Sequence, residues 1–100
     1  MKSQFEWDPD KAKSNLIKHG ISFERALLVF ADPFLLTITD FEHSDSEDRE
    51  ISMGREPLGE TLVVVHTARW YVNEERTRII SARRADRKEE VLYYSRRIPR

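Results

Sequence analysis

The chain has 100 residues, enough for one small domain with a modest core, and 39% of them are hydrophobic while 35% are charged. The lack of cysteine excludes disulfides, thiolate catalysis and the usual structural zinc sites. No apolar run approaches the ~20 residues that a membrane-spanning helix needs, and the first residues lack the apolar stretch of a signal peptide. We therefore expect a single cytoplasmic domain over residues 1–100.

Two helices are predicted in the first third of the chain, after a short extended segment at residues 5–7. The first begins after Asp8, whose carboxylate can cap it, and ends at Gly20, which can adopt the left-handed conformation typical of helix ends. The second begins after Ser22, another good N-cap, and ends before Pro33, because the residue preceding a proline disfavours helical backbone.

The hydrophobic period then changes to two, which predicts four strands in an antiparallel meander. The strands are expected at residues 35–39, 50–55, 61–69 and 77–83. Asp86 and Glu89 form a capping-box pattern, so a last helix follows and ends before Pro99. Two helices, a four-stranded antiparallel sheet and a C-terminal helix define the α+β class, with one face of the sheet buried under helices.

The net charge of −1 hides a separation of charge along the chain. Residues 69–100 carry ten basic and five acidic side chains, whereas residues 1–68 carry seven basic and thirteen acidic ones. Nine of the ten bases are arginine, whose planar guanidinium binds phosphate through two parallel hydrogen bonds. We expect the basic third of the chain to bind a polyanion and the acidic part to suit a basic partner.

Arginines gather around the predicted hairpin of the last two strands. Strand alternation places Arg69 on the face opposite His66, and it places Arg83 on the face opposite Arg78 and Arg84. Any one of these arginines is adequately explained as a solvated charge at a strand end. As a group they exceed what solubility requires, which favours phosphate binding.

Histidine is the natural general base at neutral pH. His66 lies among valines in a predicted strand, so it is better explained as a core residue, although it is also a candidate base. His19 at a helix C-terminus offsets the helix dipole, and His43 suits an exposed loop. The acids of residues 40–50 match no EF-hand, because the turn glycine is absent, so we predict neither a metal site nor a cofactor.

Four aromatic residues lie close to the arginines in the sequence: Trp70, Tyr71, Tyr93 and Tyr94. Aromatic rings beside cationic side chains are typical of surfaces that bind single-stranded RNA. Alternatively, one of the two adjacent tyrosines packs the last helix onto the sheet. The two residues at the predicted hairpin turn are harder to explain as core.

Six sequence blocks follow one another along the chain: Phe5–Asp8, Lys18–Ala26, Val29–Pro33, Glu42–Arg49, Val64–Arg69 and Arg78–Ala85. In this order they resemble the BrnT family, the ribonuclease toxins of type II toxin–antitoxin modules. The resemblance implies a RelE-like fold, metal-independent RNA cleavage that arrests translation, and neutralisation by a BrnA antitoxin. The chain departs from the family pattern at Arg84, where lysine is usual, and at the hairpin turn, which looks longer than the turn of the family.

With this resemblance, we expect attack of a ribose 2′-OH on the adjacent phosphate. Arg69 and Arg83 are the predicted clamp for the extra negative charge of the transition state. His66 or Glu47 is the candidate base, and Tyr93 is a candidate proton donor or stacking group. The further residues expected to bind RNA are Arg78, Arg84, Trp70 and Lys88.

The resemblance also implies a partner, a BrnA-type antitoxin in a 2:2 complex that contacts operator DNA only through the antitoxin. No membrane partner is expected. Two alternatives remain at this point. One is a non-catalytic module that uses the same arginines to bind RNA or an acidic protein. The other is a structural subunit, which explains the acidic segment but not the arginines.

Overall fold

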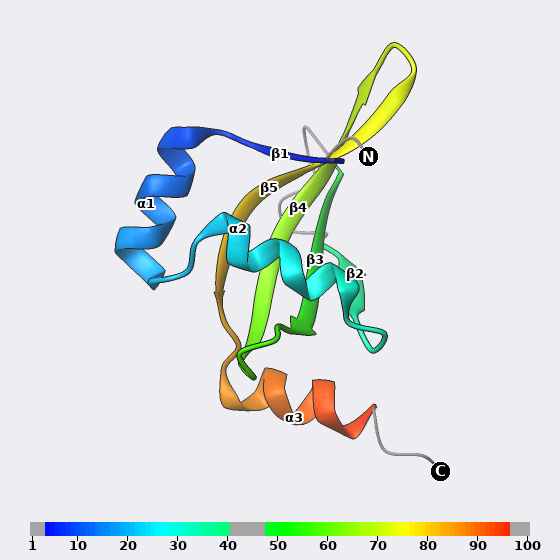
Figure 1. Ribbon diagram of the computed structural model, residues 1–100. Coiled ribbons are helices and arrows are strands. Elements are labelled where there is room, and N and C mark those ends of the chain that lie inside the picture. The colour runs from blue at the N-terminus through cyan, green and yellow to red at the C-terminus, as the bar shows by residue number, and fades with distance from the viewer. Residues whose placement is uncertain (1–3, 41–47, 97–100) are drawn as a thin grey trace.

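The computed structural model describes residues 4–40 and 48–96, which form a five-stranded sheet packed with helices (Figure 1). In chain order the elements are β1 (Phe5–Trp7), α1 (Pro9–His19), α2 (Phe23–Ala26), the 3₁₀ helix η1 (Leu27–Ala31), β2 (Leu36–Thr39), β3 (Arg49–Arg55), β4 (Thr61–Tyr71), β5 (Glu74–Arg84) and α3 (Arg87–Ser95). Within the described ranges, each helix is too short or too polar to span a membrane.

The sheet has the order β1-β5-β4-β3-β2, and β1 runs parallel to β5 while the other neighbours are antiparallel. The predicted α+β class is therefore confirmed, but the sheet has five strands and is mixed. The short segment at residues 5–7 becomes a strand because its two aromatic side chains add to the core. The ring of Phe5 packs on Phe30 and that of Trp7 on Phe23, with centroids 5.1 and 5.9 Å apart.

The predicted caps begin and end the first helices. The carboxylate of Asp8 accepts the backbone N–H of Asp10 at 2.8 Å, and Gly20 ends α1 with a φ of 70°. The second helix differs from the prediction, because after one α-helical turn it tightens into η1. There the chain lies directly against β3 at Gly54, where an added Cβ would stand 3.0 Å from atoms of Val29.

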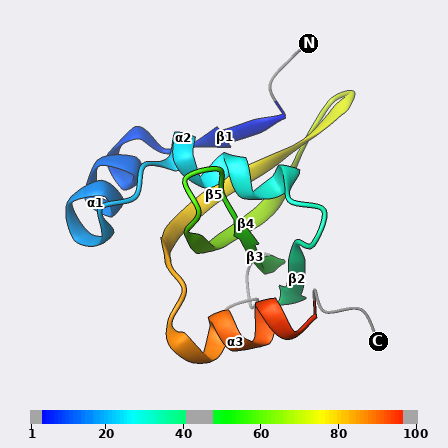
Figure 2. The same ribbon diagram turned by 60° about the horizontal axis from the view of Figure 1, so that its bottom comes forward.

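The helices cover the sheet unequally. The first three pack on one face, where Ile21, Phe23, Leu62, Val64 and Ile79 are buried in the main core. α3 crosses the lower end of the sheet (Figure 2) and forms a second, smaller cluster on the opposite face. The helical layer and α3 therefore lie on different sides of the central strands.

The β4–β5 hairpin is longer and its turn tighter than predicted. The strands continue to Tyr71 and from Glu74, so that Val72 and Asn73 alone connect them. The hairpin consequently projects beyond the rest of the sheet (Figure 1). The expectation of a long turn starting at Trp70 is wrong, because those residues extend the two strands.

A bulge in β5 changes which of its side chains share a face. Val65 pairs with Ser81 and the next residue, His66, pairs with Ile79, so Ile80 is an extra residue. Alternation restarts beyond this point. Arg78 pairs with Thr67 and Arg83 pairs with Val63, and these two β4 residues lie on the same face. Arg78 therefore faces the same side as Arg83, and the predicted placement on opposite faces is wrong.

The side chain of Asn15 completes the edge of β5. The parallel strand β1 pairs with β5 only as far as Ile79, so the main chain beyond it needs other hydrogen-bond partners. Asn15 projects from α1 and is almost fully buried. Its oxygen accepts the N–H of Ala82 at 3.0 Å, and its nitrogen donates to the carbonyls of Ala82 and Ile21 at 2.8 and 3.0 Å.

We predict that Asn15→Ala lowers the free energy of unfolding by about 2–4 kcal/mol, because buried backbone groups left unpaired cost ~1–3 kcal/mol each. Ser14→Ala, at the exposed neighbouring position of α1, is the matched control. Urea denaturation followed by circular dichroism measures both. A loss below about 1 kcal/mol for Asn15→Ala contradicts the edge-completing role.

Candidate active site

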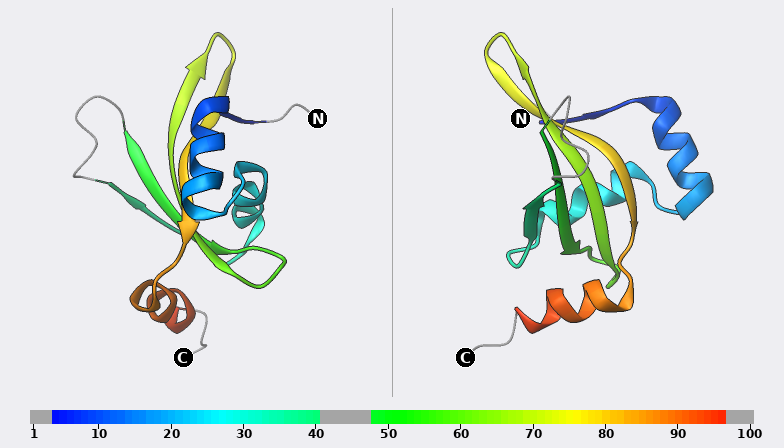
Figure 3. Two further views of the ribbon diagram at one scale, coloured as in Figure 1. Left: turned by 90° about the vertical axis from the view of Figure 1, so that its left-hand side faces the viewer. Right: turned by 180° about the vertical axis from the view of Figure 1, so that it is seen from behind.

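The sheet face opposite the helical layer carries most of the arginines. Among the described elements, only α3 covers this face, and it does so at one end (Figure 3, right). We call the uncovered part, formed by β1, β4 and β5, the open face. It displays Glu6, Arg69, Arg76 and Arg78, with Arg83 at its α3 end.

A single carboxylate organises the upper arginines of the open face. Glu6 of β1 accepts hydrogen bonds from the hydroxyl of Tyr71 at 2.7 Å and from Arg78 Nη1 at 2.8 Å. Arg76 Nη1 lies 3.8 Å from the same carboxylate. The Tyr71 hydroxyl, followed by Arg78 and Arg76, lowers the pKa of Glu6, so this carboxylate stays ionised. We call these four residues the Glu6 cluster.

Arg76 also contacts its own hairpin. Its guanidinium lies 4.8 Å from the centre of the Tyr71 ring and donates to one oxygen of Glu74 at 2.6 and 2.8 Å. Arg69 lies directly across the ladder from Arg76. Arg76 and Arg78 thus lie beside Glu6, and Arg69 follows on the next strand at the upper end of the open face, an arrangement that favours an anion.

Arg83 lies at the opposite end of the open face. Its two terminal nitrogens bind the two carboxylate oxygens of Glu89 of α3 at 2.8 and 2.9 Å. This pairing raises the pKa of Arg83 and lowers that of Glu89. Arg83 pairs with Val63 in the ladder, and Arg69 is six residues further along β4, or about 20 Å at ~3.3 Å per residue. The two predicted clamp residues therefore lie near opposite ends of the open face, and Arg83 is held at its α3 end by Glu89.

Arg84 faces the other side of the sheet. It donates to Glu60 at 2.5 Å and to the carbonyl of His19 at 3.0 Å, so it ties β5 to the end of α1. Glu60 and the buried Glu56 also bind Arg25 of α2, at 2.7 and 2.5 Å. Arg84, which was predicted to bind RNA, therefore lies on the side of the sheet opposite Arg69, Arg78 and Arg83.

His66 is a core residue. It is 6% exposed, packs edge-on against Phe30 at 5.1 Å, and places Nε2 2.6 Å from the hydroxyl of Ser52. Burial lowers the pKa of His66 to about 4. Its side chain lies under the helical layer, so the sheet separates this candidate base from the arginines of the open face.

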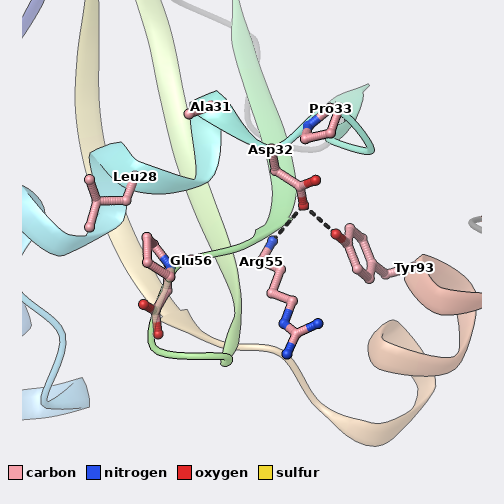
Figure 4. Close-up of a pocket in the computed structure, with 8 residues that line it drawn as sticks. Leu28, Ala31, Asp32, Pro33, Arg55, Glu56 and Tyr93 are labelled. Carbon is pink, nitrogen blue, oxygen red and sulfur yellow. Dashed lines mark hydrogen bonds between the residues drawn. The ribbon is translucent and has the colours of Figure 1, made fainter.

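Tyr93 is also buried, and it anchors α3. Its hydroxyl donates to the carboxylate of Asp32, which accepts the backbone N–H of Arg55 at 2.7 Å as well (Figure 4). These residues border a pocket of about 350 Å³ between η1, the end of β3 and α3. Of the two tyrosines considered from the sequence, Tyr93 is the one that packs the helix. It therefore does not reach the open face.

The other predicted residues are separated by the fold. Trp70 is 76% exposed but lies on the hairpin face opposite Arg69, and Lys88 is exposed on α3. Glu47 lies outside the described residues. Sequence reasoning missed Glu6 and Glu89 as partners of the arginines. Both lie in recognisable elements, but their pairing depends on long-range register that no local pattern carries.

The α+β fold and its arginine-bearing open face define a small protein with a surface suited to phosphate groups. A sequence model for the family described as the ribonuclease toxin, BrnT, of type II toxin–antitoxin systems matches residues 7–89, and the chain belongs to this family. The resemblance seen in the sequence is thereby confirmed, as is the ribonuclease toxin class. An RNA substrate and an antitoxin partner follow from that class.

The fold is similar to the crystal structure of the Brucella abortus ribonuclease toxin, BrnT, with a TM-score of 0.59 and 20% sequence identity. The similarity covers 86% of this chain and 100% of the Brucella chain. At this identity it concerns the fold alone. A comparison with curated protein sequences finds no match.

We predict that acid weakens the fold through His66. Its pKa is about 4 in the folded protein and 6.5 when unperturbed, so the unfolded chain binds more protons between these values. The free energy of unfolding therefore falls as pH drops from about 6.5 to about 4, by up to about 3 kcal/mol. Urea unfolding across this range, compared with His66→Gln, measures the effect. Equal pH dependence in both proteins contradicts it.

Proposed function

We propose that this toxin cleaves RNA without a metal ion, by attack of a ribose 2′-OH on the adjacent phosphate along the open face. The products are a 2′,3′-cyclic phosphate and a 5′-OH. The observation that carries the proposal is the shared orientation of Arg69, Arg78 and Arg83, which line one exposed surface. An RNA strand lying along this surface can contact arginines through successive phosphates.

The arginines supply the electrostatic part of the chemistry. The phosphorane transition state carries extra negative charge, and fixed donors directed at it stabilise it more than they stabilise the substrate. We assign Arg69 and Arg78 to one phosphate, and Arg83 to another further along the strand. Glu47 remains the proposed base, because the described carboxylates beside these arginines are engaged: Glu6 by Tyr71 and Arg78, and Glu89 by Arg83.

RNA binding in this proposal exchanges ion pairs. Glu6 and Glu89 occupy guanidinium donors that phosphates would use. Partly exposed pairs of this kind contribute only ~0–1 kcal/mol, so phosphate can replace a carboxylate at small cost. The carboxylates keep the arginines oriented while RNA is absent. Arg78 binds Glu6 through Nη1, so it can keep this bond while its other nitrogens bind phosphate.

We also propose that a BrnA-type antitoxin neutralises the toxin in the cytoplasm as a 2:2 complex, and that this complex contacts operator DNA only through the antitoxin. The family supports an antitoxin partner. The charge separation of the chain supports an interface that is steered electrostatically, with association that slows as salt rises.

The first test is cleavage in a chelator. We expect purified protein to cleave a generic single-stranded RNA equally well with and without excess EDTA, leaving ends that carry cyclic phosphate. Product ends are identified by mass spectrometry. Cleavage that disappears in EDTA and returns with added divalent cation contradicts metal independence, and binding without cleavage contradicts the proposed chemistry.

The second test is removal of single arginines. Arg69→Ala should lower kcat/KM by about 100-fold or more, the usual cost of one transition-state donor. Arg83→Ala removes a contact to a phosphate further along the strand, so it should lower kcat/KM mainly through a higher KM. Lys13→Ala, at an exposed position of α1 on the opposite side, should leave the rate within about twofold. Circular dichroism confirms folding of each variant. If both arginine variants cleave RNA at the normal rate, the reaction takes place on another surface.

A further inference from the structure

An apolar groove lies between the edge strand β2 and α3. It has a volume of about 270 Å³, and its walls include Leu36, Ile38, Ile51, Met53 and Leu92. The charged residue among the described side chains that line it is Glu89, the partner of Arg83. The groove therefore borders the α3 end of the open face.

The walls of the groove remain accessible to solvent. Ile38 of β2 is 53% exposed and Leu92 of α3 is 52% exposed, whereas Met53 between them is buried. Two half-exposed apolar side chains thus stand on either side of an apolar floor. Filling this site with a further apolar side chain is favourable, because it removes apolar surface from water.

The outer edge of β2 offers hydrogen-bonding groups beside the groove. Asp40 N–H bonds to the carbonyl of Arg49 at 2.9 Å, so in this antiparallel ladder Ile38 and Leu36 also bond to β3. The N–H and C=O groups of Thr37 and Thr39 consequently point away from the sheet. Among the described strands β2 is the last in the order, and it contains neither a charge nor a proline to protect its edge.

We infer that an extended segment of the antitoxin pairs with β2 as an added strand and inserts an apolar side chain into the groove between Ile38 and Leu92. The inference rests on the proposed function for the identity of the partner. The groove is lined by apolar side chains apart from Glu89, so an apolar side chain of a polypeptide suits it. An exposed strand edge beside such a pocket is the usual arrangement for recognising an extended peptide.

Charge decides between an antitoxin and a second copy of this chain. The described acids near this edge are Asp40, Asp48 and Glu50, which suit a segment that carries lysine or arginine. The chain has no lysine or arginine between Arg25 and Arg49. A second β2 would therefore bring acids and no bases to this edge, whereas a basic antitoxin segment complements it.

The position of the groove also gives the partner a means of inhibition. A side chain inserted there contacts Glu89, whose carboxylate binds Arg83. A segment that continues from β2 across α3 lies beside Arg83 and obstructs the RNA path at that end. The same contact thus serves for binding and for neutralisation.

The experiment uses the full-length chain and the purified small protein encoded next to its gene. Calorimetry should show about tenfold or greater loss of affinity for Leu92→Ala and for Ile38→Thr, the cost typical of an anchor residue. Val91→Ala is the matched control, since Val91 neighbours Leu92 on α3 and is 60% exposed but does not line the groove. It should bind within about twofold of the wild type.

Hydrogen exchange tests the added strand directly. The amides of Thr37 and Thr39 should exchange fast in the free toxin and become protected when the partner binds. Unchanged affinity in both groove variants, or unprotected amides in the complex, overturns the inference. If these amides are already protected in the free toxin, the inference is also overturned. Protection that rises with toxin concentration shows that a second copy of the chain pairs with β2. Protection that does not depend on concentration shows that residues of the same chain cover this edge.

RNA cleavage by the free variants separates this inference from the proposed function. Leu92→Ala and Ile38→Thr should cleave RNA at the wild-type rate, because neither residue lies on the open face. If the wild type cleaves RNA and binds its partner but the groove variants bind normally, the docking site alone is wrong. If the neighbouring protein does not bind at all, the antitoxin part of the proposed function fails together with this inference.

Discussion

The extra residue at Ile80 determines which arginines can act together. Ile79 and Ala82 are both buried in the main core, although they are three residues apart and simple alternation would place them on opposite faces. The bulge reconciles these two positions with one core. By the same shift it brings Arg78 to the face that carries Arg83. The packing of apolar side chains on one side of β5 therefore sets the charge pattern on the other.

The short strand β1 supplies a negative charge that offsets the repulsion between these arginines. Guanidinium groups on neighbouring positions repel one another, and Glu6 offsets this repulsion by binding Arg78 directly and lying close to Arg76. Beyond the end of β1, the side chain of Asn15 forms hydrogen bonds with the main chain of β5. A parallel strand of three residues and one buried amide thus complete the hydrogen bonding along the outer edge of β5, the strand on which the open face depends.

Local chemistry made much of the fold predictable from sequence. Caps such as Asp8 and Ser22 have their effect within one turn, and period-two patterns located β2 to β5. What escaped prediction depends on register between distant segments. Nothing near Ile80 indicates a bulge, and the pairing of Glu6 with Arg78 requires knowing that β1 joins β5. The residue types of the candidate site were therefore predictable, while their grouping into two ends of one face was not.

The helix α3 connects the two surfaces that this protein needs. Tyr93 anchors it through Asp32, Glu89 holds Arg83, and Leu92 forms a wall of the apolar groove. These three side chains lie within five residues, so a shift of the helix changes the RNA-facing and partner-facing surfaces together. A ligand shifts the equilibrium between two positions of the helix only as far as it binds one position more tightly than the other. A partner that binds the groove and requires Glu89 to remain on Arg83 therefore weakens RNA binding even where the two ligands do not touch.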